Sequence, residues 1–318
     1  MKILVTGSAG FIGFHTSQAL LKRGDEVIGV DNFNDYYDPQ LKRDRNAILE
    51  KFANFKLSEI DFSDLASLEQ VFKNEKIDKI CHLGAQAGVR YSITNPFVYQ
   101  ETNLKGTLNL LEMARHYQIK DFIFASSSSV YGGNTKVPFS ETDAVDHPIS
   151  LYAATKRANE LMAYTYHHLY GLNCTGLRFF TVYGPWGRPD MALFKFTRLI
   201  AQNQPIEIYN NGRHSRDFTY IDDIVDGVVK SLDKAYPYEV INLGNNQPVE
   251  LMYFIECIEK ALGKKAQKQM LSLQQGDVEK TYANISKAKK LLDYQPKTDI
   301  QSGIKKFVSW YQDYYKNK

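Results

Sequence analysis

The N-terminal stretch constrains the fold of this 318-residue chain more than any other part of it. An apolar run at residues 2–6 leads into three regularly spaced glycines, Gly7, Gly10 and Gly13, and then into an amphipathic segment. This order predicts a strand, a phosphate-binding turn and a helix. The glycines allow a tight turn, a close approach of backbone amides to a pyrophosphate, and close packing of the helix on the strand.

A second strand is expected at residues 26–30, and it leads into Asp31. An acidic residue about 20 positions after such a turn can accept hydrogen bonds from both hydroxyls of a ribose, and it repels a 2′-phosphate. The sequence therefore predicts NAD, rather than NADP, as the cofactor.

Strands and helices then alternate, which organises the first half of the chain. Further strands are expected near residues 55–60, 79–83, 121–125 and 172–178. This alternation predicts a doubly wound parallel α/β sheet of the Rossmann type, with ligands along the carboxyl ends of the strands. We expect residues 1–178 to form an NAD-binding domain that carries the catalytic residues. Residues 179–318 should form mainly a smaller α/β lobe that binds the substrate, with a segment from about 215 to 250 returning to the first domain.

Composition and charge argue against several classes of partner. A net charge of +3 without a basic run gives no support for nucleic-acid binding. No basic leader or long apolar stretch is present, so we expect a cytoplasmic protein without membrane contact. The scattered cysteines Cys81, Cys174 and Cys257 are expected to be buried free thiols, and no spacing of Cys or His predicts a metal site.

Chemistry is expected from a serine loop and from the helix that follows it. Ser127, Ser128 and Ser129 come directly after the fifth predicted strand, so their hydroxyls can bond a substrate hydroxyl. Tyr152 and Lys156 are four residues apart on a predicted helix and therefore share one face. An ammonium lowers the pKa of a nearby phenol from its usual value of about 10, which lets the tyrosine act as a base near neutral pH.

The glycine turn, the Ser127 loop and the pair Tyr152 and Lys156 together resemble the extended short-chain dehydrogenase/reductase superfamily, in its nucleotide-sugar branch. Within that branch, residues 86–92, 103–107 and 183–194 are similar to segments of the UDP-glucuronate 4-epimerases. The resemblance covers nearly the whole chain. It implies an isomerase that keeps NAD bound through its cycle and inverts C4 of a UDP-sugar.

In the chemistry that this resemblance implies, Tyr152 would take the proton of the sugar 4-hydroxyl while C4 gives hydride to the nicotinamide. The 4-keto sugar would then turn over and receive hydride on its other face. Ser127 would hold or relay the proton. Lys156 would lower the pKa of Tyr152 and bind the nicotinamide ribose.

The resemblance also implies two sets of binding residues. The cofactor would be bound by Gly7, Gly10, Phe11, Ile12, Gly13, Asp31, Asn32, Asp61, Phe62, Leu83, Ala85, Asn103, Tyr152 and Lys156. The UDP-sugar would be bound by Ser127, Ser128 and Ser129, by Thr181 and Arg216 at the diphosphate, by Asp277 at the ribose, and by Arg90 and Arg188 near the uronate carboxylate. Arginine suits a diphosphate because its planar fork donates two bonds at once.

Three other functions stay open. A 4-epimerase of UDP-glucose or UDP-N-acetylglucosamine shares this pattern. Uronate decarboxylases begin with the same oxidation, although they and the sugar dehydratases place acidic residues just before the Val-Tyr-Gly segment, where this chain has Ser128 and Ser129. A non-enzymatic NAD sensor need not retain the serine loop or the tyrosine and lysine. The resemblance further implies a homodimer through the helices expected at residues 97–117 and 152–169.

Overall fold

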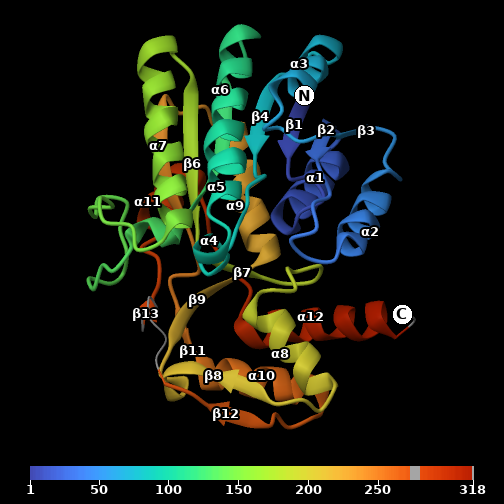
Figure 1. Ribbon diagram of the computed structural model, residues 1–318, viewed down its shortest axis with the longest axis vertical. Helices are drawn as coiled ribbons and strands as arrows, with labels where there is room; N and C mark the ends of the chain where they lie inside the picture. Colours follow the sequence, from blue (N-terminus) through green and yellow to red (C-terminus); the bar gives the residue numbers. More distant parts are fainter. Residues whose placement is uncertain (273–279, 317–318) are drawn as a thin grey trace.

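The computed structural model describes residues 1–272 and 280–316, and a parallel sheet lies at its centre (Figure 1). The seven strands have the order β10-β6-β5-β4-β1-β2-β3. They are β1 (Lys2–Thr6), β2 (Glu26–Asp31), β3 (Phe55–Glu59), β4 (Lys79–His82), β5 (Asp121–Ser127), β6 (Asn173–Phe179) and β10 (Tyr238–Leu243). The predicted doubly wound sheet is confirmed. Its strand order reverses between β1 and β4, the position at which such sheets bind ligands.

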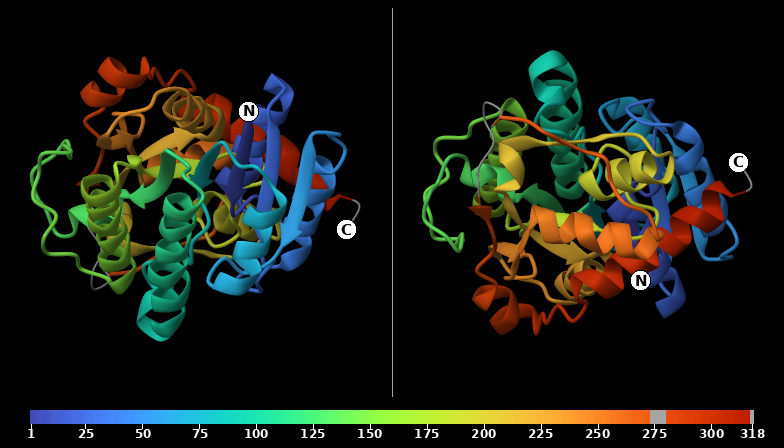
Figure 2. Two further views of the ribbon diagram at one scale, coloured as in Figure 1. Left: turned by 90° about the horizontal axis from the view of Figure 1, so that it is seen from above. Right: turned by 90° about the horizontal axis from the view of Figure 1, so that it is seen from below.

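Helices cover both faces of this sheet (Figures 1 and 2). One face carries α1 (Phe11–Arg23), α2 (Pro39–Leu49) and α9 (Ile221–Asp233), and the other carries α3 (Leu65–Asn74), α6 (Gly106–His116) and α7 (Leu151–Tyr170). Successive residues of a strand point to opposite faces, so Ile3 and Val5 join the buried cluster that contains Phe14 of α1. Leu4 joins the cluster on the other face, with Leu110 of α6. Burial on both faces explains why the strands read as continuous apolar runs.

The helix expected at residues 97–117 has an irregular start. The short helices α4 (Tyr91–Thr94) and α5 (Phe97–Tyr99) lead into a π-helical turn, η1 (Gln100–Lys105), which continues into α6. Such turns are often found at functional sites. This one carries Asn103, whose buried side chain reaches the loop after β4.

A smaller lobe lies below the large sheet in Figure 1. It contains the strands β7 (Thr181–Tyr183), β8 (Ile206–Ile208), β9 (Ser215–Tyr220), β11 (Pro248–Glu250), β12 (Lys268–Met270) and β13 (Lys280–Thr281), and the helices α8 (Ala192–Ala201), α10 (Leu251–Leu262) and α12 (Ile300–Tyr315). Within the segment 215–250, α9 and β10 join the layers of the large sheet, whereas β9 and β11 belong to a small sheet. The helix α11 (Ser286–Leu292) packs against α9 and β10.

The cysteines are buried free thiols, as expected. In the described ranges 1–272 and 280–316, the acidic, histidine and cysteine side chains form no group of three or more that could hold a metal ion. The helices in these ranges are all too short or too polar to cross a membrane.

Candidate functional site

The glycine turn joins β1 to α1 where the strand order reverses. Gly7 has a φ of +66°, and a Cβ on Gly13 would lie 2.0 Å from the Gly7 carbonyl oxygen, so side chains are excluded at these two positions. The Phe14 amide bonds back to the Gly10 carbonyl at 2.9 Å, whereas the preceding amides belong to the first turn of α1, where helix amides lack partners within the helix. Such an N-terminus suits an anion, so the turn fits the pyrophosphate of a dinucleotide.

Asp31 ends β2 beside this turn, and its side chain is buried. One carboxylate oxygen accepts the amide of Ala9 at 3.1 Å, and the other accepts the amide of Phe33 at 2.9 Å. Asn32 donates to the Asp61 carboxylate at 2.8 Å. The ends of β2 and β3 therefore bring Asp31, Asn32 and Asp61 together, as a ribose-binding edge requires.

The loop after β4 closes on the glycine turn. Leu83 and Ala85 flank Gly84, and a Cβ on Gly7 would lie only 2.7 Å from the Gly84 Cα atom. The Phe62 ring also packs against Gly84. These predicted cofactor residues thus lie around the switch point of the sheet.

Asn103, a predicted cofactor residue, contacts the loop after β4 and the helix α7. Its side-chain amide donates to the Gln86 carbonyl and to the Thr155 hydroxyl, both at 3.0 Å, and its oxygen accepts the Gln86 amide at 2.8 Å. These bonds orient the loop after β4, and the predicted contact of Asn103 with the cofactor stays a prediction.

Tyr152 and Lys156 project from the first turns of α7. Ser150 caps this helix by accepting the Ala153 amide at 3.1 Å. The Lys156 ammonium is buried and donates to the Ala125 carbonyl on β5 at 2.9 Å. Burial lowers the pKa of Lys156 to about 8.

Ser127 ends β5 and begins the serine loop. Its hydroxyl oxygen accepts the Ser129 amide at 3.2 Å and the Ser129 hydroxyl at 2.9 Å. Ser128 and Ser129 lie in the short 3-10 helix η2 (Ser128–Tyr131). The loop is therefore held in one conformation, in which Ser127 lies near enough to Tyr152 to lower the pKa of that residue.

Three influences act on the Tyr152 hydroxyl. Burial raises the pKa of Tyr152, whereas the hydrogen bond with Ser127 and the positive charge of Arg188 lower that pKa. The Lys156 ammonium donates to the Ala125 carbonyl, and its predicted effect on the Tyr152 pKa stays a prediction. Ser127 and Arg188 thus both favour loss of the Tyr152 proton.

Arg188 lies in the loop after β7 with partners that sequence reasoning missed. Its guanidinium pairs with Asp190 through two bonds of 3.0 and 2.5 Å, and it lies 5.9 Å from the centre of the Tyr36 ring. Tyr36 donates to the same Asp190 carboxylate at 3.2 Å. A further aromatic contact joins Tyr99 to Tyr152, whose ring centres are 6.1 Å apart. Tyr36 lies in a segment rich in turn-forming residues, and nothing around it in the sequence predicts its contacts with Arg188 and Asp190.

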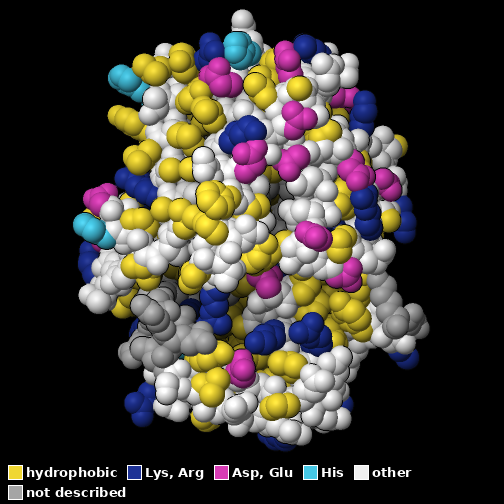
Figure 3. Space-filling model, in the orientation of Figure 1, with side chains coloured by type: hydrophobic (Ala, Val, Ile, Leu, Met, Phe, Trp, Pro, Cys, Tyr) yellow, Lys and Arg dark blue, Asp and Glu magenta, His cyan; other side chains and the backbone are white. Residues whose placement is uncertain are grey.

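The other predicted substrate residues lie in the region where the two lobes meet. The Arg90 guanidinium is 5.3 Å from the centre of the Tyr209 ring, which belongs to the smaller lobe. Thr181 begins β7, and Arg216 lies on the neighbouring strand β9. Figure 3 shows Lys and Arg side chains gathered along this meeting line. Asp277 lies outside the described residues.

Comparisons with known proteins agree with this geometry. The model of the NAD dependent epimerase/dehydratase family matches residues 3–244. UDP-glucuronate 4-epimerase 4 of Arabidopsis thaliana is 51% identical over 331 residues, which cover 98% of this chain and 76% of that protein. An uncharacterized protein of Methanocaldococcus jannaschii, MJ1055, is 58% identical over 311 residues, which cover 97% of this chain and 95% of that protein. The crystal structure of a UDP-glucuronic acid 4-epimerase from Bacillus cereus with UDP-glucuronic acid and NAD has a TM-score of 0.91 and 38% identity, covering 99% of this chain and 100% of that one.

Proposed function

The chain belongs to the NAD dependent epimerase/dehydratase family, and from this membership we propose that it interconverts UDP-glucuronate and UDP-galacturonate by inverting C4. The observation that carries the proposal is that the bond from Lys156 to Ala125 brings the start of α7, with Tyr152, to the end of β5, where Ser127 lies. Arg188 lowers the pKa of Tyr152 by its charge. Tyr152 would be the base, Ser127 the hydroxyl beside it, and Arg188 the cation that binds the uronate carboxylate. We place these three residues at the edge of the sheet that suits a dinucleotide. The similarity to proteins named UDP-glucuronate 4-epimerases supports the same substrate.

NAD fits the residues at this edge. The crowded glycine turn would take the pyrophosphate, Asp31 the adenosine ribose, and Lys156 the nicotinamide ribose. NAD bound here supplies an oxidant that takes hydride from C4 and a reductant that gives it back, so the sugar undergoes no net oxidation. The buried Asp31 carboxylate would repel the additional phosphate of NADP.

Tyr152 accepts the proton of the sugar 4-hydroxyl in this proposal and returns it after C4 has been inverted. The phenol must lose its proton near neutral pH, although burial opposes this. Ser127 opposes the effect of burial by its hydrogen bond, and Arg188 does so by its charge. In this proposal Ser127 would also hold the 4-hydroxyl, and the bond from Ser129 to its oxygen fixes the side chain for that role.

Arg188 is our first candidate for binding the uronate carboxylate, the group that distinguishes this substrate from UDP-glucose. A guanidinium has five N–H donors, and Asp190 occupies its Nε and one of its Nη2 positions. The remaining donors can bind a second carboxylate with a planar geometry. Arg90 is the second candidate, and Thr181, Arg216 and Asp277 remain the proposed contacts of the UDP portion.

The serine loop also supports epimerisation over the reactions of related enzymes. Ser128 and Ser129 stand where the resemblance places acidic residues in dehydratases and decarboxylases. Both residues belong to η2 beside Ser127, so the catalytic loop offers hydroxyls at these two positions rather than carboxylates. Decarboxylation of a 4-keto uronate needs little assistance, and it therefore becomes an outcome of the test below.

We also propose a homodimer formed through the outer faces of α6 and α7, in the cytoplasm. The two helices are in contact (Figure 1). Large apolar side chains are exposed on them and on the segment before α6: Ile93, Phe97, Leu108, Leu161, Tyr164 and Leu169. Phe97 is 79% exposed and Leu169 is 59% exposed. Grouped exposure of this kind is typical of an interaction surface.

The experiment that tests the reaction uses the purified protein with UDP-glucuronate and no added nucleotide, followed by proton NMR. We expect UDP-galacturonate to accumulate to a stable mixture without net NADH, and Tyr152→Phe to abolish this turnover. UDP-pentose and carbon dioxide as main products would identify a decarboxylase instead. Turnover of UDP-glucose or UDP-N-acetylglucosamine alone would change the substrate, and turnover of none of the three sugars would favour a sensor.

A further inference from the structure

Arg45 of α2 is a fully buried arginine whose guanidinium is held mainly by backbone carbonyls. Its Nη1 donates to the Ala9 carbonyl at 2.9 Å and to the Tyr37 hydroxyl at 2.8 Å. Its Nη2 donates to the Trp186 carbonyl at 2.5 Å and to the Gly187 carbonyl at 3.3 Å. Removing a cation from water is costly, and only a planar fork can reach acceptors on two sides at once.

The carbonyls that Arg45 binds belong to the two loops that form the proposed site. Ala9 lies in the glycine turn, and residues 186–187 directly precede Arg188. His15 of α1 adds a third anchor, because its Nε2 lies 2.9 Å from the Pro185 carbonyl. Burial lowers the pKa of His15 to about 4, so the ring is neutral at physiological pH and donates from Nε2. The carbonyls of residues 185–187 are thus all bound by side chains of α1 and α2, the helices beside the glycine turn.

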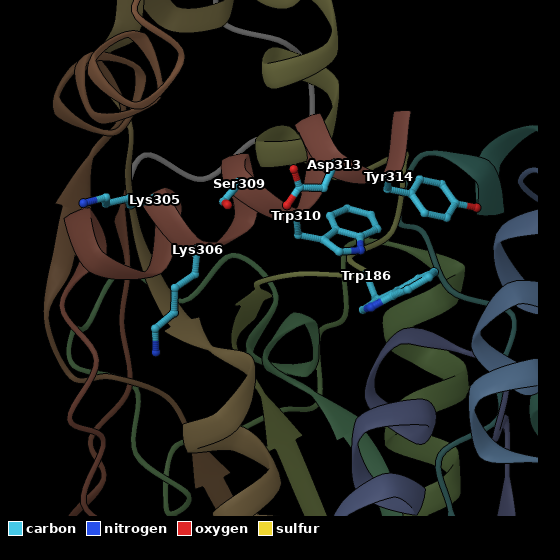
Figure 4. A pocket seen from close by; sticks show the side chains of 7 residues that line it. All are labelled: Trp186, Lys305, Lys306, Ser309, Trp310, Asp313 and Tyr314. Carbon is cyan, nitrogen blue, oxygen red and sulfur yellow. The ribbon is translucent and has the colours of Figure 1, made fainter. Parts of the chain in front are cut away.

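Trp186 is constrained by packing as well. Its ring lies 5.8 Å from Phe14 of α1, 5.2 Å from Trp310 and 5.1 Å from Tyr314, with distances measured between ring centres. Figure 4 shows Trp186 facing the last two rings, which come from α12. The φ of Trp186 is +61°, which is rare for a bulky residue and persists only where the surroundings enforce it. Tyr314 also donates to Asp44, the neighbour of Arg45.

We propose that Arg45 is a positioning residue that places the Arg188 guanidinium beside Tyr152 by holding residues 186–187 against the glycine turn. The inference goes beyond the proposed function and rests on it in one respect, the assignment of the uronate carboxylate to Arg188. In this role Arg45 acts through Arg188 and not by its own contact with substrate or cofactor. Because one guanidinium binds both loops, the position of the carboxylate-binding arginine depends on the cofactor-binding turn.

The test replaces Arg45 with lysine, whose single ammonium cannot bind both loops. Affinities of the NAD-loaded protein for UDP-glucuronate and UDP-glucose are measured by calorimetry in a Tyr152→Phe background, where the sugars are not turned over. We expect Arg45→Lys to weaken binding of UDP-glucuronate by roughly 10- to 100-fold, with a much smaller effect on UDP-glucose. Arg23→Lys is the matched control, because Arg23 pairs with Asp25 and Asp233 at the surface and should change neither affinity.

A second readout is the pH dependence of kcat with Tyr152 intact. Since the charge of Arg188 lowers the pKa of Tyr152, a displaced Arg188 should move the acid limb of the profile to higher pH. In an Arg188→Met background, Arg45→Lys should add almost nothing to either effect, because the residue through which it acts is gone. If Arg45→Lys does not fold, Tyr37→Phe removes one acceptor of the same guanidinium and should produce smaller changes in the same directions.

The possible outcomes separate this inference from the proposed function. The positioning role would be overturned if Arg45→Lys kept both the preference for UDP-glucuronate and the pH profile of the wild type. This holds even if the variant lost stability. Full effects of Arg45→Lys in the Arg188→Met background would overturn it as well. A wild-type protein that binds UDP-glucose as tightly as UDP-glucuronate would instead refute the proposed substrate. The pH profile, measured with whichever sugar is turned over, would still decide the role of Arg45.

Discussion

Glu160 provides a stability test for the helix that carries the catalytic residues. It lies on α7 one turn after Lys156, and it is fully buried. Arg178 of β6 donates two hydrogen bonds to its carboxylate, at 2.8 and 2.9 Å, and Ser126 donates a third at 2.6 Å. We predict that Glu160→Gln, which keeps the shape of the side chain and removes its charge, strongly destabilises the protein.

The magnitude follows from the burial of the partner. Arg178 is only 2% exposed, so loss of the Glu160 charge leaves a buried guanidinium without its main counter-ion. Breaking a buried ion pair from one side costs about 3–5 kcal/mol. The surface pair of Glu69 and Lys73 has both side chains nearly half exposed, and such a pair contributes about 0–1 kcal/mol. Glu69→Gln is therefore the matched control for the same change of residue.

The assay is urea unfolding followed by far-UV circular dichroism, at neutral pH and at several lower pH values. Burial raises the pKa of Glu160, but its hydrogen bonds and the charge of Arg178 together lower it by a larger amount, so the net pKa is below the ordinary 4.5. The stability that this charge contributes is complete above about pH 4.5 and is lost as the pH falls through the lowered pKa. The difference between wild type and Glu160→Gln should therefore shrink at acidic pH. A loss below about 1 kcal/mol at neutral pH, or a difference that does not change on acidification, would refute this reasoning.

Three shorter predictions concern the site and the dimer. Gly13→Ala should lose bound NAD, because the added Cβ would overlap the Gly7 carbonyl, and the loss is measured as nucleotide released on denaturation. The control is Gly133→Ala, which should retain the cofactor because the nearest atom to its added Cβ is 3.9 Å away. Ser127→Ala should raise the pKa of Tyr152 and therefore move the acid limb of the pH profile of kcat to higher pH. An unmoved limb would contradict the effect of Ser127 on Tyr152. Phe97→Asp should convert the proposed dimer to a monomer in light scattering, and an unchanged dimeric mass would place the interface elsewhere.

Much of the fold was predictable because it depends on local pattern. The apolar runs, the glycine turn and Asp31 follow one another within a short stretch, and each carries a signal of its own. Tyr152 and Lys156 were predictable as a pair because helix geometry sets the face that they share. The bond from the Lys156 ammonium to the Ala125 carbonyl was not predictable, because Ala125 lies on a strand far from Lys156 in the sequence.

The residues that sequence reasoning missed act across long separations. Arg45 and Trp186 are 141 positions apart, and Tyr36 and Asp190 are 154 positions apart. In the sequence, Arg45 belongs to a charged segment that looks like a solvated helix face, yet its side chain is fully buried. Only the folded chain brings its guanidinium to the carbonyls of two distant loops, so spacing and composition carry no signal for it.

The measurement that tests the central claim most directly follows the hydrogen at C4. UDP-glucuronate with deuterium at C4 is incubated with the protein in ordinary water without added nucleotide, and the product is analysed by NMR and mass spectrometry. We predict UDP-galacturonate that retains the deuterium at C4, because the atom leaves and returns within one active site. Product with hydrogen from water at C4 would contradict the proposed epimerisation.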